Sequence, residues 1–238
     1  MQLAIPADIQ AALDQLITAL QAAFGPELKA IVAYGSAARG DYRANESDVD
    51  LLVILGEDAQ TSLEAVGGAL KLARYSARIG VILMLVRETA QAADVFPLMY
   101  GDIAEEGVAL LGENPFHGLK PSEAHIRLRV EQELRDARIR LRRIIAESQA
   151  ESAPLRATVE RKLKQLRSPF RAALRLLAVP APVAVPAVIE ALAGRYGVAA
   201  SSVLAYDSEP RPSIMGLCAL IDRLLGEVDA LEVPSVSV

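Results

Sequence analysis

Residues 30–55 read AIVAYGSAARGDYRANESDVDLLVIL, and the pattern of this stretch indicates how the first part of the chain folds. The apolar run Ile31–Tyr34 predicts a buried strand, which ends at Gly35 and Ser36 because glycine permits a sharp turn. The alanine-rich piece Ala37–Arg39 that follows can begin a short helix. The stretch therefore predicts a strand, a turn and a helix start in close succession.

A second strand is predicted after the polar loop, and it carries two acidic residues, Asp48 and Asp50. Side chains alternate along a strand, so both carboxylates leave the same face of the sheet. Val49, Leu51 and Val53 point the other way and are expected in a core. Two carboxylates on one strand face, next to a glycine-serine turn, predict a site for Mg²⁺ and phosphate.

The residue types at the turn suit such a site. Gly35 lets the backbone approach a phosphate, and Ser36 offers a hydroxyl together with the free N–H groups and the positive dipole end of a helix. Mg²⁺ prefers hard oxygen ligands and is commonly held by one or two carboxylates plus substrate phosphates. Asp48 and Asp50 are therefore the candidate metal ligands and catalytic residues. With two metal ions, the pair could activate an attacking hydroxyl and stabilise a leaving pyrophosphate.

Two short motifs resemble those of a known family. Residues 35–40 read GSAARG and residues 47–51 read SDVDL. They are similar to the Gly-Ser-x-Ala-Arg-Gly and Ser-Asp-x-Asp-Leu signature of nucleotidyltransferases of the DNA polymerase beta superfamily. The branch that they resemble is the small bacterial and archaeal nucleotidyltransferase domain proteins, related to aminoglycoside nucleotidyltransferases. The resemblance covers about residues 5–112.

This resemblance implies a Mg²⁺-dependent enzyme that transfers a nucleoside monophosphate from an NTP, with ATP the first candidate, to a hydroxyl acceptor and releases pyrophosphate. Gly35 and Ser36 would bind phosphates, Asp48 and Asp50 would hold the metal, and Arg39 would belong to the nucleotide-binding group by bracing the loop. The acceptor stays open between a small molecule, a protein and an RNA end. Homodimers are common among the relatives, so a homodimer is expected on that ground alone.

The predicted strand Gly80–Val86 departs from the family pattern. Active members usually carry a third carboxylate on the corresponding strand, whereas this one has no acid and Glu88 lies just beyond it. Two interpretations stay open. The chain is an enzyme with two carboxylates, or it is a catalytically degenerate nucleotide-binding regulator or antitoxin-like partner. In the first case a glutamate of the helical part could act as general base, as in aminoglycoside-modifying relatives; the candidates are Glu123, Glu131 and Glu133.

The chain divides by pattern into a nucleotidyltransferase domain, residues 1–113, and a helical bundle domain, residues 121–238, joined by the turn-rich NPFHGLKP. The expected fold class is α/β in its α+β form: a small mixed sheet with flanking helices, followed by an all-α bundle. The first domain should contain helices over Pro6–Phe24, Thr61–Arg78 and Thr89–Glu106, and strands over Leu28–Tyr34, Asp48–Leu55, Gly80–Val86 and Val108–Leu111. The continuous apolar run Gly80–Val86 should be buried on both faces.

The second half is patterned for helices over Ser122–Glu147, Ala153–Ala178, Ala184–Tyr196, Ala199–Leu204 and Pro212–Leu231, with a loose tail VPSVSV. Its first two helices are rich in arginine, and the two halves differ in charge: residues 1–120 hold 16 acids and 8 bases, residues 121–238 hold 14 and 17. The arginines form either a basic wall for triphosphate or RNA, or solvated helix faces with Glu–Arg pairs.

Composition narrows the class of protein further. The chain is 52% hydrophobic and 23% charged, as expected for a globular protein. It has one cysteine, Cys218, in an apolar run, so an internal disulfide is excluded and a buried thiol is expected. We found neither a long uncharged apolar segment nor a signal-peptide pattern, so we expect a cytoplasmic protein without a membrane partner.

Overall fold

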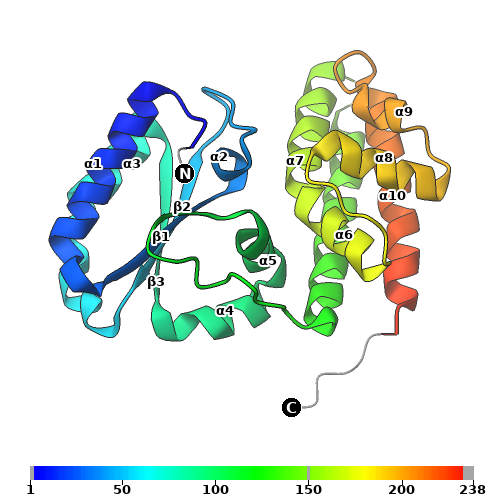
Figure 1. The fold of residues 1–238 in the computed structure, drawn as a ribbon. Coiled ribbons are helices and arrows are strands. Elements are labelled where there is room, and N and C mark those ends of the chain that lie inside the picture. Colours follow the sequence, from blue (N-terminus) through cyan, green and yellow to red (C-terminus); the bar gives the residue numbers. More distant parts are fainter. Residues whose placement is uncertain (1–2, 149–150, 233–238) are drawn as a thin grey trace. The chain divides into compact units, whose positions relative to one another are not determined.

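The fold is taken from a computed structural model of the chain, which describes residues 3–148 and 151–232. The chain forms two compact units, Met1–Lys120 and Pro121–Val238, each described here by itself (Figure 1). The first is a mixed sheet with flanking helices and the second is mainly helical, so the predicted fold class is confirmed.

Four strands form one sheet in the described part of the N-terminal unit, in the order β3-β2-β1-β4. They are β1 (Leu28–Tyr34), β2 (Val49–Leu55), β3 (Ile79–Leu85) and β4 (Val108–Leu111). β1 is antiparallel to β2 and β4, whereas β2 and β3 are parallel. The C-terminal end of β1 therefore lies beside the first residues of β2 and β3, at one end of the sheet.

Helices cover both faces of this sheet. They are α1 (Ala7–Phe24), α2 (Gly35–Arg39), α3 (Gly67–Ala77), α4 (Thr89–Val95) and α5 (Pro97–Glu106), with 3₁₀ helices at Gly25–Glu27, Glu57–Val66 and Val86–Glu88. α1 and α3 lie on one face, and α4 and α5 on the other (Figure 1). Alternating strand residues supply the two cores: Ile31 and Val53 pack on the α1 side, Val32 and Leu52 on the α5 side.

The helix predicted over Thr61–Arg78 was wrong in its extent. The segment begins as the 3₁₀ helix Glu57–Val66, and α3 starts only at Gly67. Gly67 and Gly68 thus open α3, because glycine is unfavourable inside a helix and suits a change of helix type.

Two further elements of the first half differ from the prediction. β3 is not buried on both faces, because it is an edge strand of the sheet and residues 80–83 are only partly covered. The single helix expected over Thr89–Glu106 is divided into α4 and α5 at Phe96 and Pro97. Proline has no N–H to continue the helical ladder and disfavours the helical conformation of the residue before it.

The C-terminal unit contains α6 (Glu123–Glu147), α7 (Ser152–Leu176), α8 (Val185–Tyr196), α9 (Ala200–Leu204) and α10 (Pro210–Ala230). α6, α7 and α10 pack against one another, and Cys218 is buried on α10. Ser122 precedes α6 but makes no side-chain capping bond. α10 starts at Pro210, earlier than the predicted Pro212. The tail VPSVSV lies outside the described residues.

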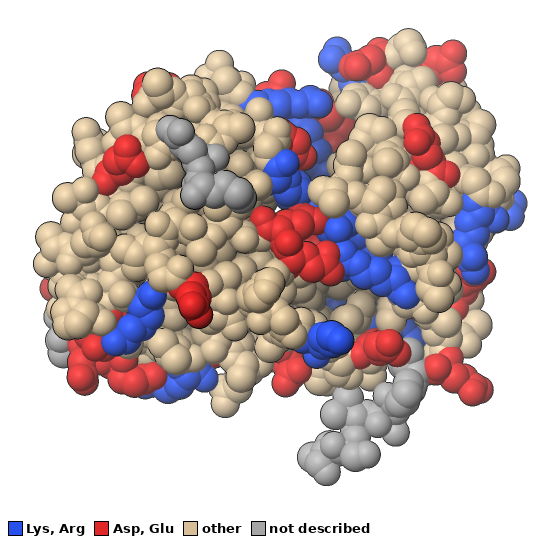
Figure 2. Space-filling view, viewed as in Figure 1, with Lys and Arg blue, Asp and Glu red and all other residues tan. Residues whose placement is uncertain are grey.

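The basic residues of α6 form many ion pairs along their own helix, and Lys164 forms one on α7. Pairs at four-residue spacing join Arg127 to Glu131, Arg129 to Glu133, Arg135 to Glu131, Arg140 to Asp136, Arg143 to Glu147 and Lys164 to Glu160. Arg135 and Arg138 also contact Asp229 and Asp222 of α10. In Figure 2 red and blue atoms are interspersed on the visible face of this unit. On α6 these contacts support a solvated face with Glu–Arg pairs rather than a basic wall, whereas Arg167 and Arg171 of α7 are buried and donate to backbone carbonyl groups.

None of the helices in residues 3–148 and 151–232 combines the length and the apolar character needed to cross a bilayer.

Candidate active site

Asp50 lies where three strands meet at one end of the sheet. It stands opposite Tyr34, the last residue of β1, and opposite Gly80 near the start of β3. Because Gly80 has no side chain, the carboxylate of Asp50 meets no side chain from this residue of β3. Burial is the largest cause that raises the pKa of Asp50, and the charge of Asp48 raises it further. The charge of Asp48 therefore acts on Asp50, although Asp48 lies just before β2 and not on the strand as predicted.

The glycine-serine turn is in contact with this carboxylate. Gly35 opens α2 with φ +71°, and a Cβ atom there would lie 2.9 Å from Asp50 Oδ2. Only glycine tolerates both the left-handed backbone and this close approach. Ser36 is half-buried in the first turn of α2, and Gly40 ends the helix in the left-handed conformation. The structure thus brings Gly35 and Asp50 together, as the motifs predicted.

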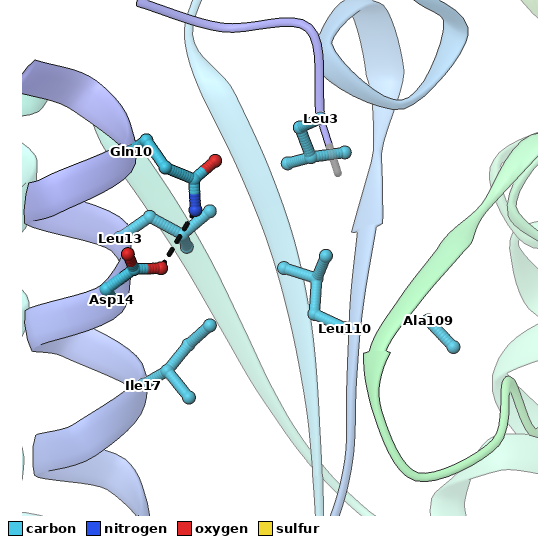
Figure 3. Close-up of a pocket in the computed structure, with 7 residues that line it drawn as sticks. All are labelled: Leu3, Gln10, Leu13, Asp14, Ile17, Ala109 and Leu110. Carbon is cyan, nitrogen blue, oxygen red and sulfur yellow. Dashed lines mark hydrogen bonds between the residues drawn. The ribbon is translucent and has the colours of Figure 1, made fainter. Parts of the chain in front are cut away.

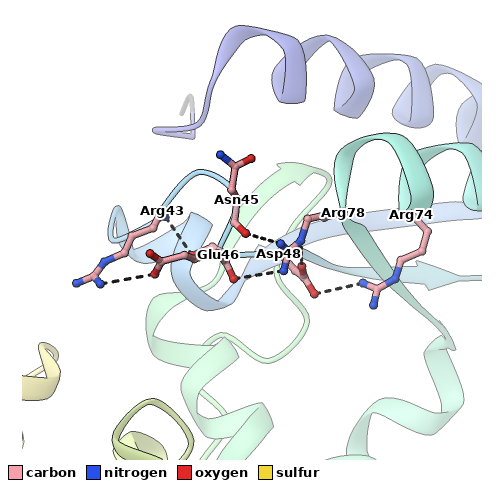
Figure 4. A network of polar contacts seen from close by, with 7 residues as sticks. Arg43, Asn45, Glu46, Asp48, Arg74 and Arg78 are labelled. Atoms are coloured by element: carbon pink, nitrogen blue, oxygen red, sulfur yellow. Dashed lines mark hydrogen bonds and ion pairs between the residues drawn. The ribbon is translucent and has the colours of Figure 1, made fainter. Parts of the chain in front are cut away.

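Asp48 lies just before β2 and is bound by two arginines that the sequence interpretation missed (Figure 4). Arg78 Nε donates to Asp48 Oδ1 at 2.7 Å, and Arg74 Nη1 donates to Asp48 Oδ2 at 3.3 Å. Arg78 also donates to the carbonyl oxygens of Asn45 at 2.6 Å and Glu46 at 3.3 Å. Arg78 therefore fixes the loop before β2, as well as neutralising Asp48.

The signal for this network was present but weak. Arg74 and Arg78 lie four residues apart at the end of the predicted helix that leads into β3. Once β3 is placed parallel to β2, that helix must end beside the start of β2. Arg78 and Asn45, which the network joins, both have positive φ, at 54° and 66°. Such backbone strain in non-glycine residues tends to occur at functional sites.

Among the described residues, Arg39 forms ion pairs with acids other than Asp48 and Asp50. It forms ion pairs with Asp41 at 3.3 Å and, at 4.0 Å, with Glu106 of α5. Its side chain is 16% exposed, and its Nε atom is buried without a hydrogen-bond partner in the described residues. The charge of Arg39 lowers the pKa of Asp50, although burial and Asp48 together raise it. The position fits the expected bracing role.

A comparison with protein-family models agrees with the motifs at this site. Residues 13–110 match the model described as nucleotidyltransferase domain. This part of the chain is a nucleotidyltransferase domain. The match is in keeping with the DNA polymerase beta superfamily, which the GSAARG and SDVDL motifs indicated. The narrower branch related to aminoglycoside nucleotidyltransferases stays a prediction. A search of curated proteins returned no match for the chain.

The nucleotidyltransferase domain has no acid on β3. The residue opposite Asp50 is Gly80, and the next residue on the same face, Ile82, packs with the core under α5. Glu88, just past the strand, accepts a hydrogen bond from the backbone N–H of Leu85 at 2.9 Å and so caps a 3₁₀ helix. Glu88 is therefore occupied in the turn that it closes.

The donor set of the nucleotidyltransferase domain fits Mg²⁺ through two carboxylates. Asp48 and Asp50 are hard oxygen donors, and among the described residues no group of three or more acidic, histidine or cysteine side chains is arranged to bind a metal. The remaining ligands would be water and substrate phosphates, as Mg²⁺ commonly has. Arg74 and Arg78 hold Asp48 in the ligand-free protein, so they compete with a cation for it.

A pocket of about 360 Å³ lies between α1 and β4, away from the carboxylates (Figure 3). Leu13 and Ile17 line it from α1 and Leu110 from β4, while Gln10 donates to Asp14 at 2.8 Å. It contains none of the motif residues.

Proposed function

We propose that the nucleotidyltransferase domain transfers a nucleoside monophosphate from an NTP, with ATP the first candidate, to a hydroxyl acceptor and releases pyrophosphate, in a Mg²⁺-dependent reaction. The general chemistry, nucleotidyl transfer, is that of its domain family. The finer points rest on the residues at the end of the sheet.

The observation that carries the proposal is the contact between Gly35 and Asp50. A Cβ atom added to Gly35 would lie 2.9 Å from Asp50 Oδ2, and this proximity of the glycine-serine helix start to the Asp50 carboxylate supports the proposal. A phosphate bound at the backbone of Gly35 and Ser36 would thus lie next to Asp50. A divalent cation on the carboxylates could contact the same phosphate. This juxtaposition is what nucleotidyl transfer needs, because charge must be neutralised where the leaving pyrophosphate develops.

The roles of the residues follow. The backbone of Gly35 and the hydroxyl of Ser36 bind and orient phosphate oxygens, while Asp48 and Asp50 hold Mg²⁺. The metal supplies positive charge on the phosphates and lowers the pKa of an attacking hydroxyl. Arg39 keeps α2 fixed against α5 through Glu106. The acceptor hydroxyl attacks the α-phosphorus, and the bond from this phosphorus to the bridging oxygen of the β-phosphate breaks.

The candidates for the general base are Glu123, Glu131 and Glu133. Glu131 and Glu133 are engaged in ion pairs with arginines on α6, and Glu123 is an exposed residue in its first turn. Helix-surface pairing accounts for Glu131 and Glu133. The acceptor remains open between a small molecule, a protein and an RNA end, and the paired arginines of α6 do not favour RNA.

Calorimetric titration tests the proposal. ATP, GTP, CTP and UTP are titrated with and without Mg²⁺ into wild-type protein, Asp48→Asn and the control Asp136→Asn, whose carboxylate pairs with Arg140 on α6. We expect Mg²⁺-dependent binding that Asp48→Asn loses and the control keeps. A screen for pyrophosphate release over hydroxyl acceptors then follows. Binding without turnover for any acceptor would favour the nucleotide-binding regulator, and absence of binding for all four nucleotides would reject the proposal.

A further inference from the structure

Arg74 and Arg78 both contact Asp48, but they are held differently. Arg78 donates to Asp48, Asn45 and Glu46, with its shortest bonds at 2.6 and 2.7 Å. Within the described residues, Arg74 has one such bond, to Asp48 at 3.3 Å, and its side chain is 56% exposed. Exposed ion pairs of this length contribute little and exchange readily. Arg78 is thus a fixed part of the loop, whereas Arg74 can change its partner.

The guanidinium of Arg74 lies over β3 at the residue opposite Asp50. A Cβ atom on Gly80 would be 3.5 Å from Arg74 Nη1 and 3.4 Å from Asp50 Oδ1. The family pattern expects an acid on this strand. This chain has a glycine there and a cation from the neighbouring helix above it. A small group placed at that point would touch both Arg74 and Asp50.

A pocket of about 390 Å³ adjoins this point, between α3 and β3. Its lining residues are two cations, one tyrosine, one glycine and three aliphatic residues: Lys71, Arg74, Tyr75, Gly80, Leu70, Ile79 and Val81. Tyr75 is 86% exposed. None of the lining residues is acidic, in contrast to the carboxylate pair next to it. The volume suits a small ligand, and the lining suits an anionic one.

We propose that Arg74 is a phosphate-binding residue of the nucleotide site, with Lys71 as the second cation of its pocket. This inference rests on the proposed function. In the ligand-free protein Arg74 neutralises Asp48. When Mg²⁺ takes Asp48 and the nucleotide enters, the guanidinium turns from the carboxylate to an oxygen of the polyphosphate. A guanidinium suits this exchange because it binds carboxylate and phosphate oxygens in the same forked geometry.

The exchange predicts opposite effects on two ligands. In Arg74→Gln, the affinity for Mg²⁺-ATP should fall about tenfold, since a charge-assisted hydrogen bond to phosphate is lost. The affinity for adenosine should not change. The affinity for Mn²⁺ added alone should rise, about twofold to threefold, because a cation that competes for Asp48 is removed. Arg74→Lys should keep part of the ATP affinity.

The matched control is Arg87→Gln. Arg87 is also an exposed arginine in an ion pair, with Glu57, but it follows β3 at the opposite end of the strand. It should leave ATP, adenosine and Mn²⁺ binding unchanged. Calorimetry gives the nucleotide affinities, electron paramagnetic resonance gives free Mn²⁺, and circular dichroism shows that each variant is folded.

The outcomes separate this inference from the proposed function. If the wild type binds Mg²⁺-ATP and Arg74→Gln binds it equally well, the inference is wrong and the proposed function stands. If Arg74→Gln loses ATP and Mn²⁺ affinity together, Arg74 only supports the fold of the site, and the inference is again overturned. If the wild type binds no nucleotide, the proposed function is wrong, and the inference that rests on it is overturned as well.

Discussion

Carboxylates that lie near arginines have pKa values shifted in opposite directions in the two units. In the C-terminal unit, a hydrogen bond from Arg140 lowers the pKa of Asp136, and hydrogen bonds from Arg195 and Tyr196 lower that of Glu227. At the end of the sheet, burial and the neighbouring charge of Asp48 raise the pKa of Asp50 despite two nearby arginines. In the C-terminal unit, hydrogen bonds from arginine favour the charged form of the carboxylate. A buried carboxylate that is crowded by a second one marks a place that can receive a cation.

The largest test of this contrast is removal of the crowded carboxylate. Asp50→Asn should abolish Mg²⁺-dependent nucleotide binding. The rate of pyrophosphate release should fall roughly a thousandfold, because several kcal/mol of transition-state charge stabilisation are lost. Glu227→Gln in the helical unit should leave the rate unchanged. Equal rates for wild type and Asp50→Asn in a pyrophosphate assay would remove Asp50 from the reaction.

Gly35→Ala tests the contact that joins turn and carboxylate. The new Cβ would meet Asp50 Oδ2 at 2.9 Å in a backbone with φ +71°, so we expect a loss of about 2 kcal/mol in the free energy of unfolding. Gly40→Ala is the control, because Gly40 has φ +80° but open space around it, and should cost only about 1 kcal/mol of strain. Urea denaturation measures both, and equal losses would mean that the clash is relieved without cost.

The pH dependence of stability should have opposite signs in the two units. The folded-state pKa of Asp50 is raised, so the folded state binds its proton more tightly, and stability falls as pH rises from the ordinary carboxyl range through the raised pKa. In EDTA above that range, Asp50→Asn should therefore be more stable than the wild type, on the order of 1 kcal/mol.

The folded-state pKa of Glu227 is lowered, so its contribution is present above the unfolded pKa and is lost as pH falls through the lowered value. Glu227→Gln should thus be destabilising near neutral pH and lose its effect in acid. Urea denaturation of both variants and the wild type, from about pH 3 to pH 8, gives the two slopes. If the contributions of Asp50 and Glu227 to stability changed with pH in the same direction, the contrast between the two units would be wrong.

The smallest effect is expected for the glutamates on α6. Glu133→Gln removes an exposed pair with Arg129 and should change stability by about 0.3 kcal/mol, with turnover unchanged. Glu131→Gln loses pairs with Arg127 and Arg135 and should behave alike. A collapse of pyrophosphate release in either variant, with nucleotide binding intact, would instead identify the general base.

Local sequence patterns were sufficient for the centre of the site. The apolar run before Gly35 predicted the strand that became Leu28–Tyr34, and the two-residue period of Asp48–Val53 predicted which side chains reach the core. Both features depend on backbone periods within a few residues. The same locality explains the helix bounds in the second half, where α6 and α8 begin and end within about two residues of the prediction.

The surroundings of the carboxylates could not be predicted in the same way. Arg74 and Arg78 are separated from Asp48 by 26 and 30 residues, and their contact depends on the parallel pairing of β2 and β3. The partial exposure of β3 likewise depends on strand order, because the same apolar run would suit a central strand. Strand order and charge pairing are properties of the assembled sheet, not of any one segment.

The connection between β2 and β3 keeps its variable part away from the carboxylates. β2 leaves the carboxylates and reaches the far end of the sheet at Leu55, where the 3₁₀ helix Glu57–Val66 begins, and α3 then returns so that Arg78 ends beside Asp48. Changes in length within Glu57–Val66 therefore fall at the far end and leave the register of Asp48, Asp50 and Gly80 intact. Ala59 and Val66 anchor this segment in the core, so the exposed residues 63–65 between them are the place to insert a peptide tag or a fluorescent reporter.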